Sequence, residues 1–80
     1  MTEVTVRYFG PLLDVTGTAE ERLNVHFPAK LSAVEQEIRR MHPDLGEQQY
    51  RIAVDETICE REETIDRARE IALLPAFSGG

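Results

Sequence analysis

The sequence has little of several features on which common functions depend. Its 80 residues include one cysteine, Cys59, so no internal disulfide can form and a reducing compartment is expected. No apolar run approaches the length of a membrane span, and no basic region followed by an apolar stretch opens the chain. We therefore expect a cytoplasmic protein without a signal peptide or a membrane partner.

Basic residues are scarce, with nine Lys and Arg against fifteen Asp and Glu and a formal net charge of -6. A nucleic-acid-binding protein needs a basic face to meet phosphates, so nucleic acid is not expected as a partner. An acidic chain suits docking on a more basic protein. Lys30 is the only lysine, which leaves little surface for conjugation of one copy to another.

No set of side chains in the sequence is typical of a catalytic or metal site. His26 and His42 do not lie at ligand-like spacing from Cys59, and no Cys-His-Asp pattern supports Cys59 as a nucleophile. A phosphate loop of the form G-x-x-x-x-G-K-[ST] is absent. We expect no metal or cofactor to be bound by this chain, and Cys59 to be a small, partly buried residue.

Hydrophobic patterning predicts two N-terminal strands and one main helix. Residues 4–8 and 23–27 alternate between apolar and polar side chains, as in an antiparallel hairpin, with a helical turn at 12–15 closed by Gly17. The helix is expected over 32–42, with a capping box formed by Ser32 and Glu35 and a Glu35–Arg39 pair on its outer face. Pro43 ends it. Its predicted apolar stripe is Leu31, Val34, Ile38 and Met41.

The last strand explains the predicted architecture. Residues 52–54 and 58–59 read as short strands, whereas 71–74 are all apolar, which is typical of a strand buried on both faces. Placed in the middle of the sheet, this strand lies parallel to the first. The result is an α+β fold of the β-grasp (ubiquitin-like) type, with a domain over 1–75 and a flexible tail over 76–80.

The tail ends in Gly79-Gly80, which is the most informative feature of the sequence. Glycine has no Cβ, so these two residues can enter a narrow channel and leave the terminal carboxylate open to chemistry. The five or six residues after Leu74 can extend on the order of 20 Å. Because no side-chain chemistry was found elsewhere, the carboxyl group of Gly80 is the predicted reactive group.

Several segments carry a resemblance to a known family over essentially the whole chain. They are Val6-Arg7-Tyr8-Phe9, the following Leu12-Leu13-Asp14-Val15-Thr16-Gly17, Ile52-Ala53-Val54-Asp55 and the ending Ile71-Ala72-Leu73-Leu74-Pro75-Ala76-Phe77-Ser78-Gly79-Gly80. The sequence thereby resembles the small subunits of molybdopterin synthase, the MoaD type within the MoaD/ThiS sulfur-carrier family. It departs from the family's pattern at three places. Ala76 replaces a second proline, Asp55 replaces an asparagine, and Ala68-Arg69 replaces a Gly-Asp turn.

The resemblance implies a carrier mechanism. An activating enzyme of the MoeB type would use ATP to adenylate the carboxylate of Gly80, and a sulfur donor would convert it to a thiocarboxylate. The tail would then enter a large subunit of the MoaE type, within a heterotetramer, and give sulfur to cyclic pyranopterin monophosphate. Catalytic groups are expected on the large subunit, so this chain is a sulfur-donating subunit and not itself the catalyst.

The resemblance also implies which residues contact the partner. A hydrophobic patch of the sheet corresponds here to Phe9, Ile58 and Leu74, which could instead be ordinary core residues. In the tail, Phe77 is expected to anchor in the partner, and Pro75 and Ser78 to contact it.

Three other functions remain open from the sequence. The chain could carry sulfur for thiazole synthesis, cysteine synthesis or tRNA thiolation, because the same tail would serve. It could be a ubiquitin-like modifier joined to lysines, since both uses begin with the same adenylate. It could also be an interaction module with an inert tail.

Overall fold

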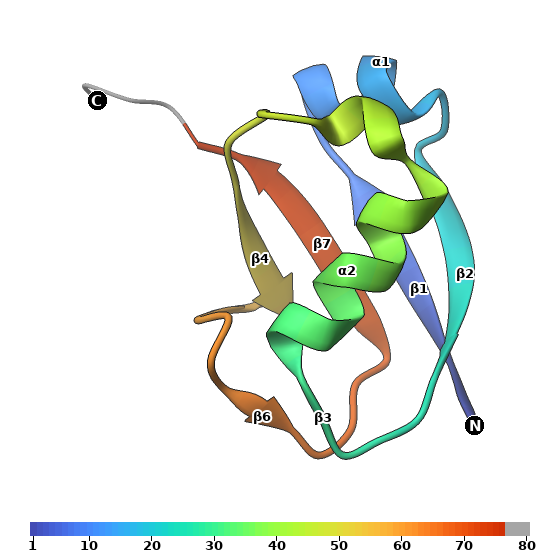
Figure 1. Cartoon of the computed structure of the whole chain (residues 1–80), viewed down its shortest axis with the longest axis vertical. Helices are drawn as coiled ribbons and strands as arrows, with labels where there is room; N and C mark the ends of the chain where they lie inside the picture. The colour runs from blue at the N-terminus through green and yellow to red at the C-terminus, as the bar shows by residue number, and fades with distance from the viewer. Residues whose placement is uncertain (77–80) are drawn as a thin grey trace.

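The chain folds into a five-stranded mixed sheet with one main helix across one face (Figure 1). The computed structural model describes residues 1–76. The sheet has the order β2-β1-β7-β4-β5, built from β1 (Thr2–Tyr8), β2 (Glu20–Val25), β4 (Tyr50–Val54), β5 (Thr57–Cys59) and β7 (Glu70–Pro75). A second, two-stranded sheet pairs β3 (Ala29–Lys30) with β6 (Thr64–Ile65). The helices are α1 (Pro11–Thr16), α2 (Leu31–Met41) and the 3-10 helix η1 (Pro43–Leu45).

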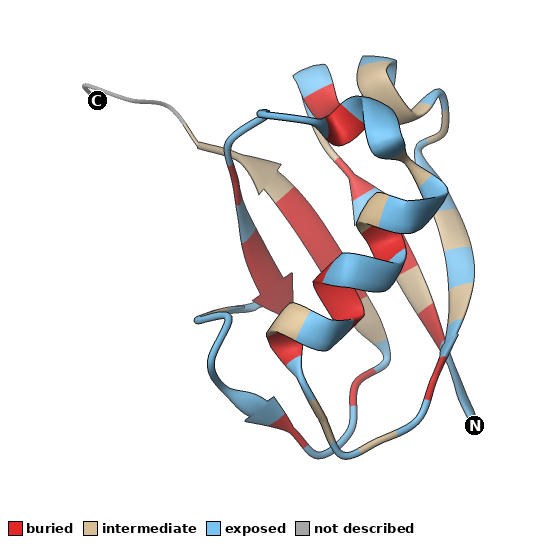
Figure 2. Cartoon of the chain, viewed as in Figure 1, coloured by how far each residue is buried: buried red, intermediate tan, exposed pale blue. Residues whose placement is uncertain are grey.

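Strand β7 lies in the middle of the sheet, as its unbroken apolar sequence predicted. It runs parallel to β1, with Val6 opposite Ile71, and antiparallel to β4, with Ile52 opposite Leu73. Ile71 and Leu73 are fully buried beneath α2, and Figure 2 shows the buried centre of β7 beside the mostly buried strand β4. The predicted β-grasp arrangement is confirmed, and so is the helical turn α1, which Gly17 closes in the left-handed conformation.

Helix α2 begins one residue before the predicted start, and the predicted capping box is wrong. Lys30 occupies the N-cap position, and no side chain caps the helix. Instead, the N–H groups of Leu31 and Ser32 donate to the carbonyl oxygens of Glu63 and Arg61, at 2.9 and 3.0 Å. Because carbonyl groups of a distant loop accept hydrogen bonds from these first N–H groups of the helix, the capping box of Ser32 and Glu35 is not needed, and Glu35 turns towards the interior.

The core lies between α2 and the sheet. Three of the four predicted stripe residues of α2 are buried, but Met41, the last residue of the helix, is 40% exposed. The core positions shared by the helix and the central strands are Val4, Val6, Leu31, Val34, Ile38, Ile52, Val54, Ile71 and Leu73.

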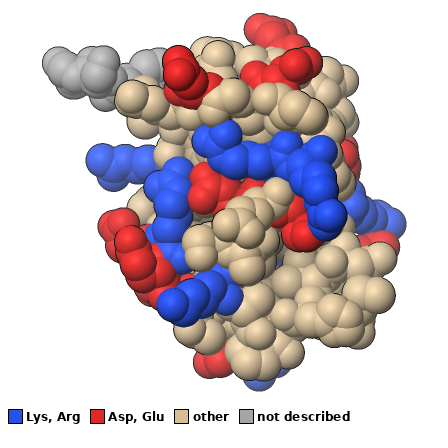
Figure 3. Space-filling view, viewed as in Figure 1, with Lys and Arg blue, Asp and Glu red and all other residues tan. Residues whose placement is uncertain are grey.

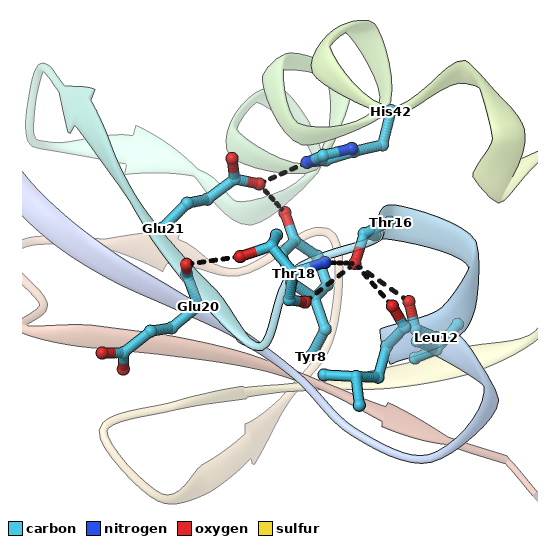
Figure 4. A network of polar contacts seen from close by, with 8 residues as sticks. Tyr8, Leu12, Thr16, Thr18, Glu20, Glu21 and His42 are labelled. Atoms are coloured by element: carbon cyan, nitrogen blue, oxygen red, sulfur yellow. Dashed lines mark hydrogen bonds and ion pairs between the residues drawn. The ribbon is translucent and has the colours of Figure 1, made fainter.

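A polar network joins the end of α2 to the β1–β2 hairpin (Figure 4). The Tyr8 hydroxyl donates to Glu21 Oε2 at 2.5 Å, and His42 Nε2 contacts the same oxygen. The Tyr8 and His42 rings also meet edge to face, with centroids 5.3 Å apart. Burial opposes the charge on Glu21, but these two hydrogen bonds outweigh it and lower its pKa. His42 therefore has a structural role at the end of α2.

The two turns that depart from the family's pattern, at Asp55 and at Ala68-Arg69, are joined by hydrogen bonds to the Asp55 side chain. Asp55 and Glu56 both have positive φ and form the β4–β5 turn, while Ala68 is buried and has no positive φ. Asp55 Oδ1 accepts hydrogen bonds from the N–H groups of Arg69 and Glu70, both at 2.9 Å. Both hydrogen bonds need only an acceptor oxygen, so an aspartate can make them without the amide donor of the family's asparagine.

Gly10 tests how tightly the end of β7 is held. Its φ of 58° and ψ of -136° favour glycine, and an added Cβ would lie 3.0 Å from Pro75 Cγ. We expect Gly10→Ala to lower the free energy of unfolding by about 1–3 kcal/mol in urea denaturation. The matched control is Gly17→Ala, where no atom lies within 4 Å of the new Cβ. We expect a smaller loss there; equal losses would mean that the Pro75 contact relaxes without cost.

Candidate functional site

The base of the tail is held on both sides. Pro75 lies opposite Tyr50 in the β4–β7 ladder and lies close to Gly10, the N-cap residue of α1. Ala76, the last described residue, donates its N–H to the carbonyl oxygen of Gln49 at 3.4 Å. The predicted site residues Phe77, Ser78, Gly79 and Gly80 lie outside the described residues. The structure thus gives the direction in which the chain leaves the sheet, at the end opposite to the N-terminus of β1 (Figure 1).

The face of the sheet away from α2 carries an apolar patch. Ala53 and Ala72 lie opposite each other in register, and Ile58 lies opposite Ala53 on the other side. Leu74 and Phe9 extend this face towards the tail base, and both are half-buried. Ile58 is 45% exposed. We call these five residues the open-face patch.

The alternative interpretation of Phe9, Ile58 and Leu74 as core residues is wrong. None of the three belongs to the buried cluster beneath α2 or packs against it. The guanidinium group of Arg7 lies over the Phe9 ring at 5.2 Å and covers part of it. The three residues therefore share a surface, and the role of that surface in partner binding stays a prediction, as does that of Pro75.

A second cluster, centred on Glu35, fixes the start of β4. The Tyr50 hydroxyl donates to Glu35 Oε2 at 2.5 Å, and Arg61 donates from Nε at 2.8 Å and from Nη2 at 3.1 Å. Arg39 Nε lies 3.6 Å from the same carboxylate. Both arginines also lie over the Tyr50 ring, at 5.3 and 5.6 Å. The Glu35 cluster thus ties α2, the segment after β5 and the residue opposite Pro75 to one carboxylate.

Glu35 is charged although it is buried. Burial disfavours the charge, but hydrogen bonds from Arg61 and Tyr50 and the charge of Arg39 outweigh it, so the pKa of Glu35 lies below its usual value. Burial and the neighbouring carboxylate raise the pKa of Tyr50 to about 12. Tyr50 therefore remains a neutral donor at physiological pH.

The sequence did not predict this cluster. It placed Glu35 on the outer face of the helix, and this prediction is wrong, although the Glu35–Arg39 pair itself forms. The signal was present in the spacing, because Glu35 follows Leu31 by four residues and precedes Ile38 by three, both on the buried stripe. Arg61 comes from 26 residues away, which no local pattern indicates.

The described residues hold no metal-binding group of three or more His, Cys, Asp and Glu side chains. Cys59 is partly buried, as predicted, and its thiol donates to the Thr57 carbonyl oxygen at 3.4 Å. Burial and the charge of Glu63 raise the pKa of this thiol, so it is a poor nucleophile. Within residues 1–76, neither α-helix is long and apolar enough to cross a membrane.

The architecture defines the class of protein, a β-grasp domain of the ubiquitin-like type. Its sequence matches the ThiS family over residues 6–80, and the chain belongs to that family. The resemblance to the MoaD/ThiS sulfur carriers is thereby confirmed. No curated protein matches the sequence.

Solved structures with the same fold come from archaea and bacteria. Small archaeal modifier protein 1 from Methanosarcina acetivorans is 25% identical, with a TM-score of 0.74, over 100% of this chain and 98% of that one. SAMP1 from Haloferax volcanii is 20% identical, with a TM-score of 0.82, over 99% of this chain and 100% of that one. A complex of subunits 1 and 2 of molybdopterin-converting factor from Helicobacter pylori contains a chain that is 22% identical. The TM-score is 0.64, and the match covers 99% of this chain and 100% of that one.

Removing the central carboxylate tests the Glu35 cluster. We expect Glu35→Ala to lower the free energy of unfolding by about 2–3 kcal/mol, because the Tyr50 hydroxyl and Arg61 lose their shared acceptor. The control is Glu37→Ala on the same helix, where the carboxylate pairs with Arg40 in solvent. We expect no measurable loss there. Similar urea midpoints for both variants would contradict the structural role given to Glu35.

The lowered pKa of Glu35 also predicts a pH dependence. Its stabilising contribution is complete above its unfolded-state pKa, near 4.5, and is lost as the pH falls through the lower folded-state pKa. The difference in unfolding free energy between the wild type and Glu35→Gln should therefore be largest near pH 7 and shrink below about pH 4.5. Urea denaturation at several pH values measures it, and a constant difference would contradict the prediction.

Proposed function

We propose that this chain is the sulfur-carrier small subunit of a molybdopterin synthase. The observation that carries the proposal is the match to the ThiS family, which continues through Gly79-Gly80 to residue 80. The anchored end of β7 supports it, because a rigid base lets a short extended tail reach a defined depth in another protein. No described side chain offers a competing catalytic site.

The chemistry takes place on the carboxyl group of Gly80. A carboxylate is a poor electrophile, so an activating enzyme of the MoeB type transfers the adenylyl group of ATP to it and releases pyrophosphate. A persulfide sulfur then attacks the acyl carbon, AMP leaves, and cleavage of the sulfur–sulfur bond by a thiol leaves a thiocarboxylate. ATP belongs to the activating enzyme, and this chain contributes the acyl group alone.

The acceptor site belongs to the large subunit. Gly79 and Gly80 pass through its channel, and the thiocarboxylate gives sulfur to cyclic pyranopterin monophosphate. The open-face patch, with Phe9, Ile58 and Leu74, forms the docking surface, and Pro75, Phe77 and Ser78 follow it into the partner. The fold shared with the Helicobacter pylori complex of subunits 1 and 2 supports a large-subunit partner.

A ubiquitin-like modifier is the second candidate function. The similarity to small archaeal modifier protein 1 from Methanosarcina acetivorans favours it, at 25% identity over the whole chain. In this case a lysine amine of a target protein displaces AMP from the same adenylate and forms an isopeptide bond. The first step is common to both functions, so the product of the second step distinguishes them.

Intact-protein mass spectrometry tests the two functions. We expect incubation with the activating enzyme, ATP and a persulfide donor to give the mass gain of one oxygen replaced by sulfur, localised to Gly80. Omitting ATP is the control and should leave the mass unchanged. Deleting Gly80 should preserve folding and large-subunit binding but abolish molybdopterin formation in a reconstituted assay. Adducts on target lysines without sulfur exchange would instead identify a modifier, and synthesis supported by the deletion variant would overturn the carrier mechanism.

A further inference from the structure

A notch of about 260 Å³ lies at the edge of the sheet where β5 ends. Strand β5 ends at Cys59, opposite Ile52, whereas β4 begins two residues earlier at Tyr50. The segment after β5 crosses this end, so Arg51 from β4 and Arg61 from the crossing segment line the same notch.

Arg51 gives the notch a positive charge without an ion-pair partner in residues 1–76, whereas the charge of Arg61 is paired with Glu35. Arg61 is held by two hydrogen bonds to Glu35 and by the Tyr50 ring, so its guanidinium group is ordered before any partner binds. Arg51 is exposed, and no carboxylate of residues 1–76 lies within 4.0 Å of its side-chain nitrogens. Glu60 is the one acidic residue lining the notch, and it forms no ion pair with either arginine. Arginine and lysine side chains gather in an arc on the α2 face of the molecule (Figure 3).

The notch adjoins both the tail base and the open-face patch. Tyr50 lies opposite Pro75, and Arg51 lies opposite Leu74, in the β4–β7 ladder. Ile58 of the patch lines the notch as well. Residues directly opposite each other in a ladder share a face of the sheet, so Arg51 lies on the patch side with Leu74, whereas Arg61 lies against Tyr50 and Glu35 on the α2 side. A protein that covers the patch and takes up the tail therefore reaches the guanidinium group of Arg51.

We propose that the notch binds the carboxylate of an aspartate or glutamate at the mouth of the large subunit's channel. This inference rests on the proposed function. A guanidinium fork matches a carboxylate in two parallel hydrogen bonds, which fixes orientation as well as position. The net charge of -6 attracts a basic partner from a distance but cannot define its orientation. One carboxylate that pairs with the guanidinium group of Arg51 does define it, and sets the depth to which the tail enters.

Isothermal titration calorimetry of this chain with its large subunit tests the proposal. We expect Arg51→Glu to raise Kd by about tenfold or more at low salt, with a smaller effect at high salt, and Arg51→Gln to raise it less. The matched control is Arg67→Glu, an equal charge change at an exposed position before β7, at the end of that strand away from the tail. Its Kd should change little. The urea midpoints of all variants confirm that each is folded.

A charge swap identifies the occupant. Substituting arginine for each acidic residue at the channel mouth should restore the affinity of Arg51→Glu at one position, and this restoration should persist when Gly79 and Gly80 are deleted. An effect of Arg51→Glu that disappears with the deletion would make the chain's own carboxyl terminus the occupant and overturn the inference. A Kd for Arg51→Glu equal to that of Arg67→Glu would overturn it while leaving the carrier function intact. A wild-type chain that does not bind the large subunit would overturn both.

Discussion

The pairing of β7 between β1 and β4 is the constraint on which the rest of the structure depends. A parallel neighbour on one side and an antiparallel neighbour on the other satisfy the backbone of β7 along most of its length. Its side chains Ile71 and Leu73 fill the core beneath α2, while Leu74 faces the opposite side. One strand thus supplies core, surface patch and tail base together, so a change in its register would displace all three.

The Glu35 cluster extends this constraint to the edge of the sheet. Burying a carboxylate is unfavourable unless donors surround it, and here Tyr50 and Arg61 both donate to it. Tyr50 is also the residue opposite Pro75, so the cluster holds the strand against which the tail leaves. The same contacts order Arg61 at the notch. Stability of the domain and geometry of the proposed docking surface therefore depend on shared residues.

In the proposed carrier, the folded domain and the reacting group would be separate parts of the chain. In the proposed function, the reacting acyl group would belong to residues that have no side chain to react, and the enzymes that act on it would provide the catalytic groups. In this proposal the β-grasp domain contributes position: an exit for the tail, an apolar patch beside it and the notch at Arg51, which defines the orientation of the partner. A modifier would use the same three features, which explains why the fold alone does not distinguish the two functions.

The sequence by itself determined the order of the main strands and helix and the central place of the last strand, because periodicity and unbroken apolar runs are local signals of burial. The resemblance of its segments determined the family, whereas the short strands β3 and β6 were not predicted. The sequence also indicated Gly79-Gly80 as the reactive end. It misplaced Glu35 and the start of α2, because the spacing of Ser32 and Glu35 fits a local capping box as well as it fits a buried position for Glu35. Only the tertiary structure decided between a capping and a buried Glu35, because the groups that donate to its carboxylate belong to Tyr50 and Arg61, far along the chain. The same holds for the open-face patch and the notch: each is assembled from separate strands, and strand pairing alone brings their side chains together.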